Sequence, residues 1–194
     1  MHVRINKVET LSDDWYVLRK TTFDYRRRNG SWQTMSRETY DRGHGAVILL
    51  YSLAQRTVLL VRQFRFPAWN YGGSHDGFLI EAPAGLLDAA TPEARIKAEV
   101  EEETGYCVDK VRKVFEAFMS PGSVTERLHF FVAEYDPSAA RGEGGGVEEE
   151  GEDIEVLELD IGRAEQMIAD GSIEDGKTIM LLQYARLHLF GAAR

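Results

Sequence analysis

Three glutamates lie on one face of a helix that the sequence predicts over residues 92–104. Thr91 is a favourable N-cap for this helix, and proline is tolerated at the first helical position, where its missing N–H costs no hydrogen bond. Gly105 supplies the stop signal. The glutamates stand at positions i, i+3 and i+4 and therefore share a face. They are Glu99, Glu102 and Glu103.

Such a cluster has two interpretations. Charged runs on a helix are often a solvated face that carries no site. Carboxylates packed this closely repel one another, however, and each resists ionisation if it is left unpaired. A hard divalent cation relieves the repulsion, and Mg2+ takes its oxygen ligands from a few carboxylates and from substrate phosphates.

The frame around the glutamates resembles the Nudix box. Gly85 is followed by thirteen residues and then by Glu99-Val-Glu-Glu-Glu-Thr-Gly-Tyr, where the box has a Gly and later Arg-Glu-apolar-x-Glu-Glu-x-Gly-apolar. The match is one residue short, and Ala98 stands at the position of the Arg that normally helps to orient the glutamates, with Arg95 and Lys97 close by. Thr91 lies near the place of an upstream glutamate of the box. These departures affect the support of the glutamates, whereas the metal-binding carboxylates are all present.

The resemblance implies a metal site and a catalytic base. It implies Mg2+, with Mn2+ as an alternative, held by Glu99, Glu103, Glu152 and the backbone carbonyl of Ala84. Glu102, Glu103 and Glu152 are implied to be catalytic.

The base is expected in the Gly- and Glu-rich segment 137–153, whose composition by itself predicts a solvated, mobile linker. An unstructured loop of this length inside a compact domain is unusual and often functional. The resemblance implies that one of its glutamates reaches the metal. We expect Glu152, and the alternatives Glu148, Glu149 and Glu150 stay open.

Substrate contacts are expected at several separate points. Residues 45–51 and 57–65 read as apolar strands buried on both faces, and the second ends at Arg65, whose guanidinium suits phosphate oxygens. The segments SPGSVTE (120–126) and DGKT (175–178) look like those of a group within the family that acts on GDP-mannose. That likeness implies substrate contacts by Glu126 and Lys177. The alternative interpretation of these two residues is that they are ordinary solvated side chains. The resemblance to the box implies that Gly85 also contacts the substrate.

Residues 1–42 read as a β-rich arm of short alternating runs, with Asn29-Gly30 as a hairpin turn. The basic run 26–28 is interpreted as a solvated strand end. In the sugar-nucleotide branch of the family such arms exchange across a homodimer. The resemblance therefore implies nucleotide contacts by Arg37 and Glu38, and for Trp15 either base stacking or core packing.

Charge and cysteine content narrow the class of protein. The net charge of −9 argues against a nucleic-acid-binding surface, which would need Lys and Arg. The single cysteine, Cys107, fits a reducing compartment. The sequence contains neither an apolar run as long as a membrane span nor the apolar core of a secretory signal at its N-terminus, so we expect a cytoplasmic protein.

These observations predict an α/β protein. We expect a mixed-sheet α/β/α sandwich of the Nudix type over residues 43–194, preceded by the arm over residues 1–42, which is exchanged in a homodimer. The expected activity is Mg2+-dependent hydrolysis of a nucleotide sugar, GDP-mannose giving GMP and mannose 1-phosphate. ADP-ribose is the alternative substrate, and a nucleotide-binding module without catalysis is the alternative function.

Overall fold

The computed structural model describes residues 1–87 and 89–191, without the side chain of Glu150. The chain forms two compact units: the first is Met1–His44 with Phe118–Arg127, and the second is Gly45–Ala117 with Leu128–Arg194. The first unit thus contains a later segment in addition to the arm. The expected division between residues 42 and 43 stays a prediction.

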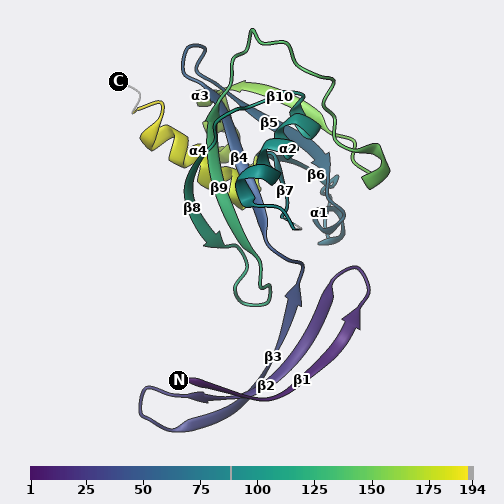
Figure 1. The fold of residues 1–194 in the computed structure, drawn as a ribbon, viewed down its shortest axis with the longest axis vertical. Helices are drawn as coiled ribbons and strands as arrows, with labels where there is room; N and C mark the ends of the chain where they lie inside the picture. Colours follow the sequence, from purple (N-terminus) through teal and green to yellow (C-terminus); the bar gives the residue numbers. More distant parts are fainter. Residues whose placement is uncertain (88, 192–194) are drawn as a thin grey trace. The chain divides into compact units, whose positions relative to one another are not determined.

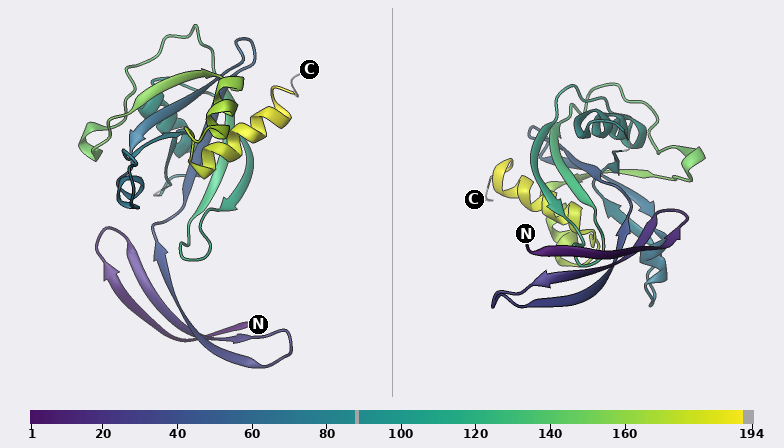
Figure 2. Two further views of the ribbon diagram at one scale, coloured as in Figure 1. Left: turned by 180° about the vertical axis from the view of Figure 1, so that it is seen from behind. Right: turned by 60° about the horizontal axis from the view of Figure 1, so that its bottom comes forward.

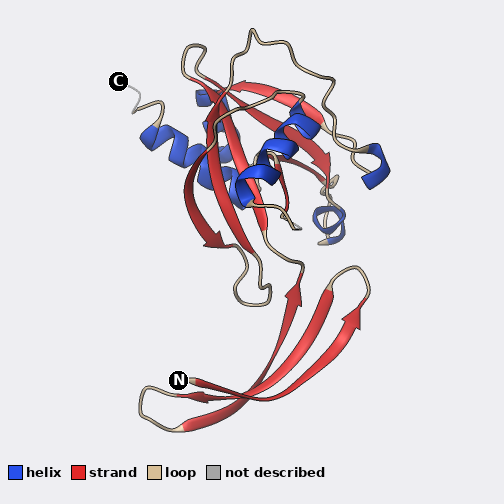
Figure 3. Ribbon diagram, viewed as in Figure 1, coloured by secondary structure: helices blue, strands red, loops and turns tan. Residues whose placement is uncertain are grey.

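The first unit is a three-stranded antiparallel sheet in the order β1-β2-β3 (Figures 1 and 3). Its strands are β1 (Val3–Asp13), β2 (Val17–Arg26) and β3 (Trp32–Asp41). Gly30 has φ 86° in the β2–β3 turn, so the hairpin predicted at Asn29-Gly30 is confirmed. The later segment joins β3 through Tyr40, whose carbonyl accepts a hydrogen bond from the N–H of Thr125.

The second unit contains a seven-stranded mixed sheet in the order β10-β5-β4-β9-β8, with β6 paired to β5 and β7 paired to β4. The β4–β9 pair is parallel, whereas β4–β5 and β5–β10 are antiparallel. The strands are β4 (Gly45–Ser52), β5 (Thr57–Phe64), β6 (Phe78–Glu81), β7 (Ala84–Leu86), β8 (Arg112–Phe118), β9 (Arg127–Glu134) and β10 (Glu155–Asp160).

Helices cover both faces of this sheet (Figure 2). Helix α2 (Pro92–Thr104) packs Ile96 and Val100 on one face, against Ile48 of β4 and its neighbours. Helices α3 (Ile161–Ala169) and α4 (Gly176–His188) cover the other. Residues 46–50 and 58–61 are almost wholly buried, because side chains alternate between two covered faces. The predicted two-sided burial of β4 and β5 is confirmed.

Helix boundaries follow local capping chemistry. The Thr91 hydroxyl accepts a hydrogen bond from the N–H of Ala94 at 3.3 Å, and Gly105 ends α2 with φ 74°, both as predicted. Helix α3 begins at Ile161, because the side chain of Asp160 is its N-cap. A short helix, α1 (Phe66–Asn70), follows β5. Of the helices in the described part of the chain, none is long and apolar enough to cross a bilayer.

Candidate functional site

The three glutamates of α2 form a cluster that is largely withdrawn from solvent. Glu99 is 4% exposed and Glu103 is 1% exposed, while Glu102 is partly buried. Strand β7 passes so close to the helix that a Cβ on Gly85 would overlap the Glu99 carboxylate. In this arrangement only glycine fits at position 85 of β7.

Burial and mutual repulsion disfavour the charged forms of these groups. Burial is the largest cause that raises the pKa of Glu99, to about 7, and the charges of Glu102 and Glu152 add to it. Burial likewise raises the pKa of Glu103 well above its ordinary value, followed by the charges of Glu99 and Glu152. The cluster is therefore a site of concentrated negative charge in a poorly solvated position.

Arg95 supplies part of the opposing charge. Its Nη2 lies 2.5 Å from Oε1 of Glu99, one helical turn away, and its Nη1 lies 3.6 Å from Oε2 of Glu102. The guanidinium support expected at position 98, where the chain has Ala98, thus comes from the preceding turn of the helix. The spacing of Arg95 to Glu99, i to i+4, is the sequence signal for this pair.

The residues present suit a divalent cation in their donor chemistry. Among the described residues no three His, Cys, Asp or Glu side chains already converge on one point, and Arg95 is paired with two of the carboxylates. Glu103 Oε2 is buried, however, and receives no hydrogen bond from the part of the chain that the structure describes. A buried acceptor without a donor is costly, and a hard cation satisfies it together with the repulsion between the carboxylates.

Glu152 joins the cluster from the loop before β10. Its Oε2 accepts a hydrogen bond from the N–H of Val147 at 3.0 Å, and its charge contributes to the raised pKa values of Glu99 and Glu103. Glu148 and Glu149 are exposed on the short 3-10 helix η1 (Glu148–Glu150). The side chain of the third alternative, Glu150, lies outside the described part of the chain.

The expected phosphate-binding cations share one buried carboxylate. Arg65 Nη2 lies 2.7 Å from Oε2 of Glu81, and Lys177 Nζ lies 2.9 Å from Oε1 of the same residue. Burial alone would raise the pKa of Glu81, but Lys177 and Arg65 together lower it below its ordinary value. Arg65 also opposes the rise in the pKa of Glu103, which places this cationic group beside the acidic cluster.

The start of α4 completes this network. Asp175 is the helix N-cap: its Oδ1 lies 3.0 Å from Lys177 Nζ, and its Oδ2 accepts the Thr178 hydroxyl at 2.6 Å. The same Thr178 oxygen accepts the N–H of Ala82 at 2.7 Å. Within the segment DGKT (175–178), the resemblance implied a role for Lys177 and none for Asp175 or Thr178. An Asp three residues before a buried Thr at a helix start is the capping signal that would have found them.

The remaining expected site residues lie in the first unit. Trp15 is 82% exposed in the turn between β1 and β2, so its alternative interpretation as a core residue is wrong for this chain. Arg37 and Glu38 are exposed on β3. Glu126 pairs with Arg42, at 3.3 Å between Oε1 and Nε.

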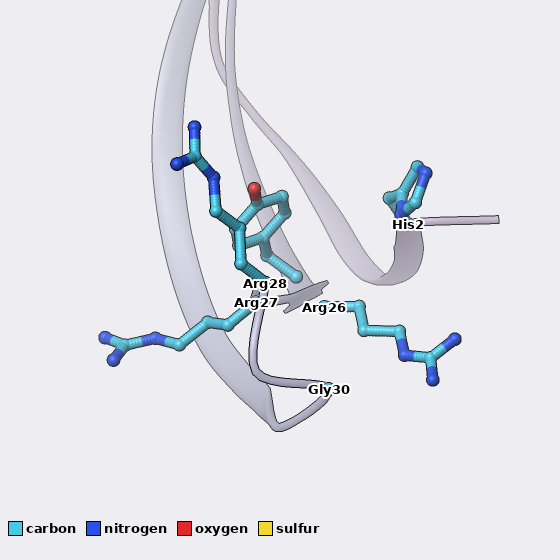
Figure 4. Close-up of a pocket in the computed structure, with 6 residues that line it drawn as sticks. His2, Arg26, Arg27, Arg28 and Gly30 are labelled. Carbon is cyan, nitrogen blue, oxygen red and sulfur yellow. The ribbon is translucent and has the colours of Figure 1, made fainter.

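A hollow on the arm lies away from these residues. It is lined by His2, Tyr25, Arg26, Arg27, Arg28 and Gly30. Figure 4 shows the guanidinium groups of Arg26, Arg27 and Arg28 pointing in different directions. The Arg27 guanidinium donates hydrogen bonds to Oε1 of Gln33. The donors do not converge as an anion site requires, and the run is exposed, as predicted.

Two family models match the chain. A model described as the N-terminal domain of the GDP-mannose pyrophosphatase NudK matches residues 2–40, and a model described as the NUDIX domain matches residues 41–179. The second match alone covers well over half of the chain and includes the acidic cluster, Glu152, Arg65 and Lys177.

Curated relatives resemble the chain over nearly its whole length. A GDP-mannose pyrophosphatase of Pectobacterium atrosepticum is 56% identical over 183 residues, which is 94% of this chain and 93% of that protein. A GDP-mannose pyrophosphatase of Klebsiella pneumoniae is 53% identical over 184 residues, 95% of this chain and 91% of that protein.

A solved structure has a similar fold. The crystal structure of an ADP compounds hydrolase superposes with a TM-score of 0.72 at 13% identity, over 98% of both chains. Together with the family match, this similarity confirms the predicted α/β fold with its N-terminal arm.

Proposed function

This chain belongs to the Nudix family, and from that premise we propose that it hydrolyses the diphosphate bond of GDP-mannose, releasing GMP and mannose 1-phosphate. The observation that carries the proposal is the similarity to curated GDP-mannose pyrophosphatases at 53–56% identity, which extends through the arm. Glu99, Glu102 and Glu103 are all present and clustered, as hydrolysis at this box requires.

The acidic cluster is the proposed metal site. Glu99, Glu103, Glu152 and the carbonyl of Ala84 would hold the ion, which we take to be Mg2+, with Mn2+ as an alternative. Such an ion supplies Lewis acidity and neutralises charge on the diphosphate. Glu102 would complete the negative charge of the site, paired with Arg95 as it is in the structure.

Glu152 is the proposed base. Its carboxylate would accept a proton from the attacking water, a role that requires a defined position within hydrogen-bond reach. The Val147 N–H holds one of its oxygens, and the other is free to accept.

Arg65 and Lys177 are the proposed diphosphate contacts. Glu81 holds both cations in place before substrate arrives, which reduces the entropy cost of binding. Arg65 is the better placed of the two, since 39% of its side chain is exposed and its fork has donors beyond those given to Glu81. Gly85 is a further proposed substrate contact, beside Glu99 on the helix.

The arm is proposed to act in a homodimer. Its strand β1 exposes Val3, Ile5, Val8 and Leu11, apolar side chains that a partner subunit would cover. In that arrangement Trp15, Arg37, Glu38 and Glu126 would contact the nucleotide sugar, Trp15 by stacking. A solution mass of twice the chain mass by light scattering is expected, and a monomer would contradict this part of the proposal.

We also propose the cytoplasmic location that the sequence predicted.

The substrate is tested by a panel of nucleotide sugars assayed side by side with Mg2+. GDP-mannose is expected to have the highest kcat/KM. A higher kcat/KM for ADP-ribose would instead make the chain an ADP-ribose pyrophosphatase.

The alternative function is that of a module that binds nucleotides without cleaving them. Two variants of α2 distinguish it from hydrolysis. Glu103→Gln is expected to abolish GMP release, because it removes the buried carboxylate. The matched control is Glu101→Gln, an exposed glutamate on the same helix, and it should retain activity. Equal release by wild type and Glu103→Gln, or none by either, would refute hydrolysis at this site.

A further inference from the structure

The glycine-rich segment Gly142–Gly146 contacts the C-terminal end of α2. The N–H of Gly145 donates to the carbonyl of Glu103 at 2.9 Å, and the N–H of Gly146 donates to the carbonyl of Glu102 at 3.0 Å. The N–H of Gly142 donates to the carbonyl of Gly105 at 2.8 Å. The last carbonyls of a helix have no partner within the helix, so this segment satisfies acceptors that would otherwise need water. We call it the glycine strap.

The strap lies too close to the helix for side chains. A Cβ on Gly144 would stand 2.8 Å from the carbonyl carbon of Thr104 and 2.9 Å from both the carbonyl oxygen of Glu103 and the N of Gly105. These are backbone atoms, which cannot rotate away. Gly144 also has φ 65°, in the left-handed region. The glycine content that predicts a mobile linker is thus also what permits close backbone contact at Gly144.

The contacts continue from the strap to Glu152. A Cβ on Gly146 would stand 2.6 Å from Oε2 of Glu152, and the N–H of the next residue, Val147, donates to that oxygen. The N–H of Ile154 donates to the carbonyl of Gly145 at 3.0 Å, so the residues on both sides of Glu152 are tied to the strap.

We propose that the glycine strap is a positioning element that ties Glu152 to the catalytic helix, beside Glu99 and Glu103. The inference rests on the proposed function only in that Glu152 serves hydrolysis. Its physical basis is the repulsion within the cluster: Glu99 and Glu103 push another carboxylate away, so a mobile loop would not keep Glu152 there. Backbone hydrogen bonds to the helix carrying those glutamates oppose that repulsion.

The first test compares two alanine variants at glycines with positive φ. Gly144→Ala adds a Cβ that overlaps the helix backbone, whereas Gly171→Ala adds one with nothing within 4 Å at φ 81°, so both share the backbone strain but only one displaces the strap. A displacement of Glu152 by about 1 Å is expected to lower kcat about 100-fold. The loss should fall mainly on kcat rather than on KM, since the phosphate-binding cations Arg65 and Lys177 are not touched. Equal kcat values for the two variants would overturn the proposal.

A double-mutant cycle tests whether the strap acts through Glu152. If it does, adding Gly144→Ala to Glu152→Gln should lower kcat little further, because the residue that the strap positions has already lost its function. A full multiplicative loss in the double variant would show that the strap has only a general structural role, and would refute the proposal.

Amide hydrogen exchange of the wild-type protein provides a readout that needs neither activity nor a folded variant. The N–H groups of Gly145 and Gly146 are expected to be protected like those in the last turn of α2. Exchange at the rate of an open chain would overturn the proposal. If the wild type hydrolyses no nucleotide sugar, the proposed function fails, while this protection still decides whether the strap is bound to the helix.

Discussion

Replacing Glu99 by glutamine is expected to stabilise the metal-free protein while it removes activity. Glu99 is buried, and its pKa is raised from 4.5 to about 7, first by burial and then by the charges of neighbouring glutamates, with Arg95 opposing. Above the raised pKa the folded protein must keep an unfavourable charge at this position. Glutamine has nearly the same shape but carries no charge.

The sign and size of the effect follow from the pKa. Because the folded pKa lies above the unfolded one, the favourable contribution of Glu99 is fully present below pH 4.5 and is lost as pH rises through about 7. The interval between these values corresponds to about 3 kcal/mol at 1.36 kcal/mol for each pH unit. At about pH 8 Glu99→Gln should therefore raise the free energy of unfolding by about 3 kcal/mol, and at about pH 4 wild type and variant should be equal.

Urea unfolding in the presence of a chelator measures this difference. With a slope of about 2 kcal/mol per molar, the midpoint at pH 8 should rise by about 1.5 M. Adding Mg2+ should stabilise wild type by mass action and leave Glu99→Gln unchanged, so the order of stability reverses. Glu101→Gln, the exposed control on the same helix, should show neither effect. A variant no more stable than wild type at pH 8, with the same pH dependence, would refute the argument that the cluster is electrostatically strained.

Two further changes test the groups around the cluster. Glu81→Ala removes the buried partner of Arg65 and one of the two partners of Lys177, and should lower the free energy of unfolding by about 3 kcal/mol. Because the pKa of Glu81 is lowered in the folded protein, its contribution to stability is lost as pH falls below 4.5. The difference in the free energy of unfolding between wild type and Glu81→Ala should therefore shrink in acid. A difference that stays constant with pH in urea unfolding would contradict the pairing. Arg95→Leu removes the partner of Glu99 and should raise the Mg2+ concentration for half-maximal activity about 10-fold. An unchanged Mg2+ titration would show that Arg95 does not replace the arginine that the Nudix box has at the position of Ala98.

Local features of the fold were predictable where the chemistry is local. The Thr91 cap, the Gly105 stop and the Asn29-Gly30 hairpin each depend on a few neighbouring residues. The burial of β4 and β5 on both faces follows from uninterrupted apolar runs. The start of α3 likewise follows from a local cap, since the Asp160 side chain accepts from the N–H groups of Gly162 and Arg163.

Composition alone did not reveal the contacts that the segment 137–153 makes with α2. Low-complexity Gly and Glu content is typical of mobile linkers. The amino-acid sequence alone does not distinguish a glycine that makes the backbone flexible from one that permits close backbone contact. Gly144 is required because the backbone of α2 lies within 3 Å of where its Cβ would be. That neighbour is about forty residues away in the sequence, so only the folded chain reveals it.

The sequence by itself determined the acidic face of α2, because helical spacing places Glu99, Glu102 and Glu103 together wherever that helix is formed. It also determined the family, through the order of several short motifs. The tertiary structure alone decided what those carboxylates meet: Glu152 carried to them by the glycine strap, and one buried Glu81 that holds Arg65 and Lys177. The physical reason is that repulsion, burial and pairing act between atoms close in space, and residues far apart in the chain come that close only when the sheet and its helices have packed.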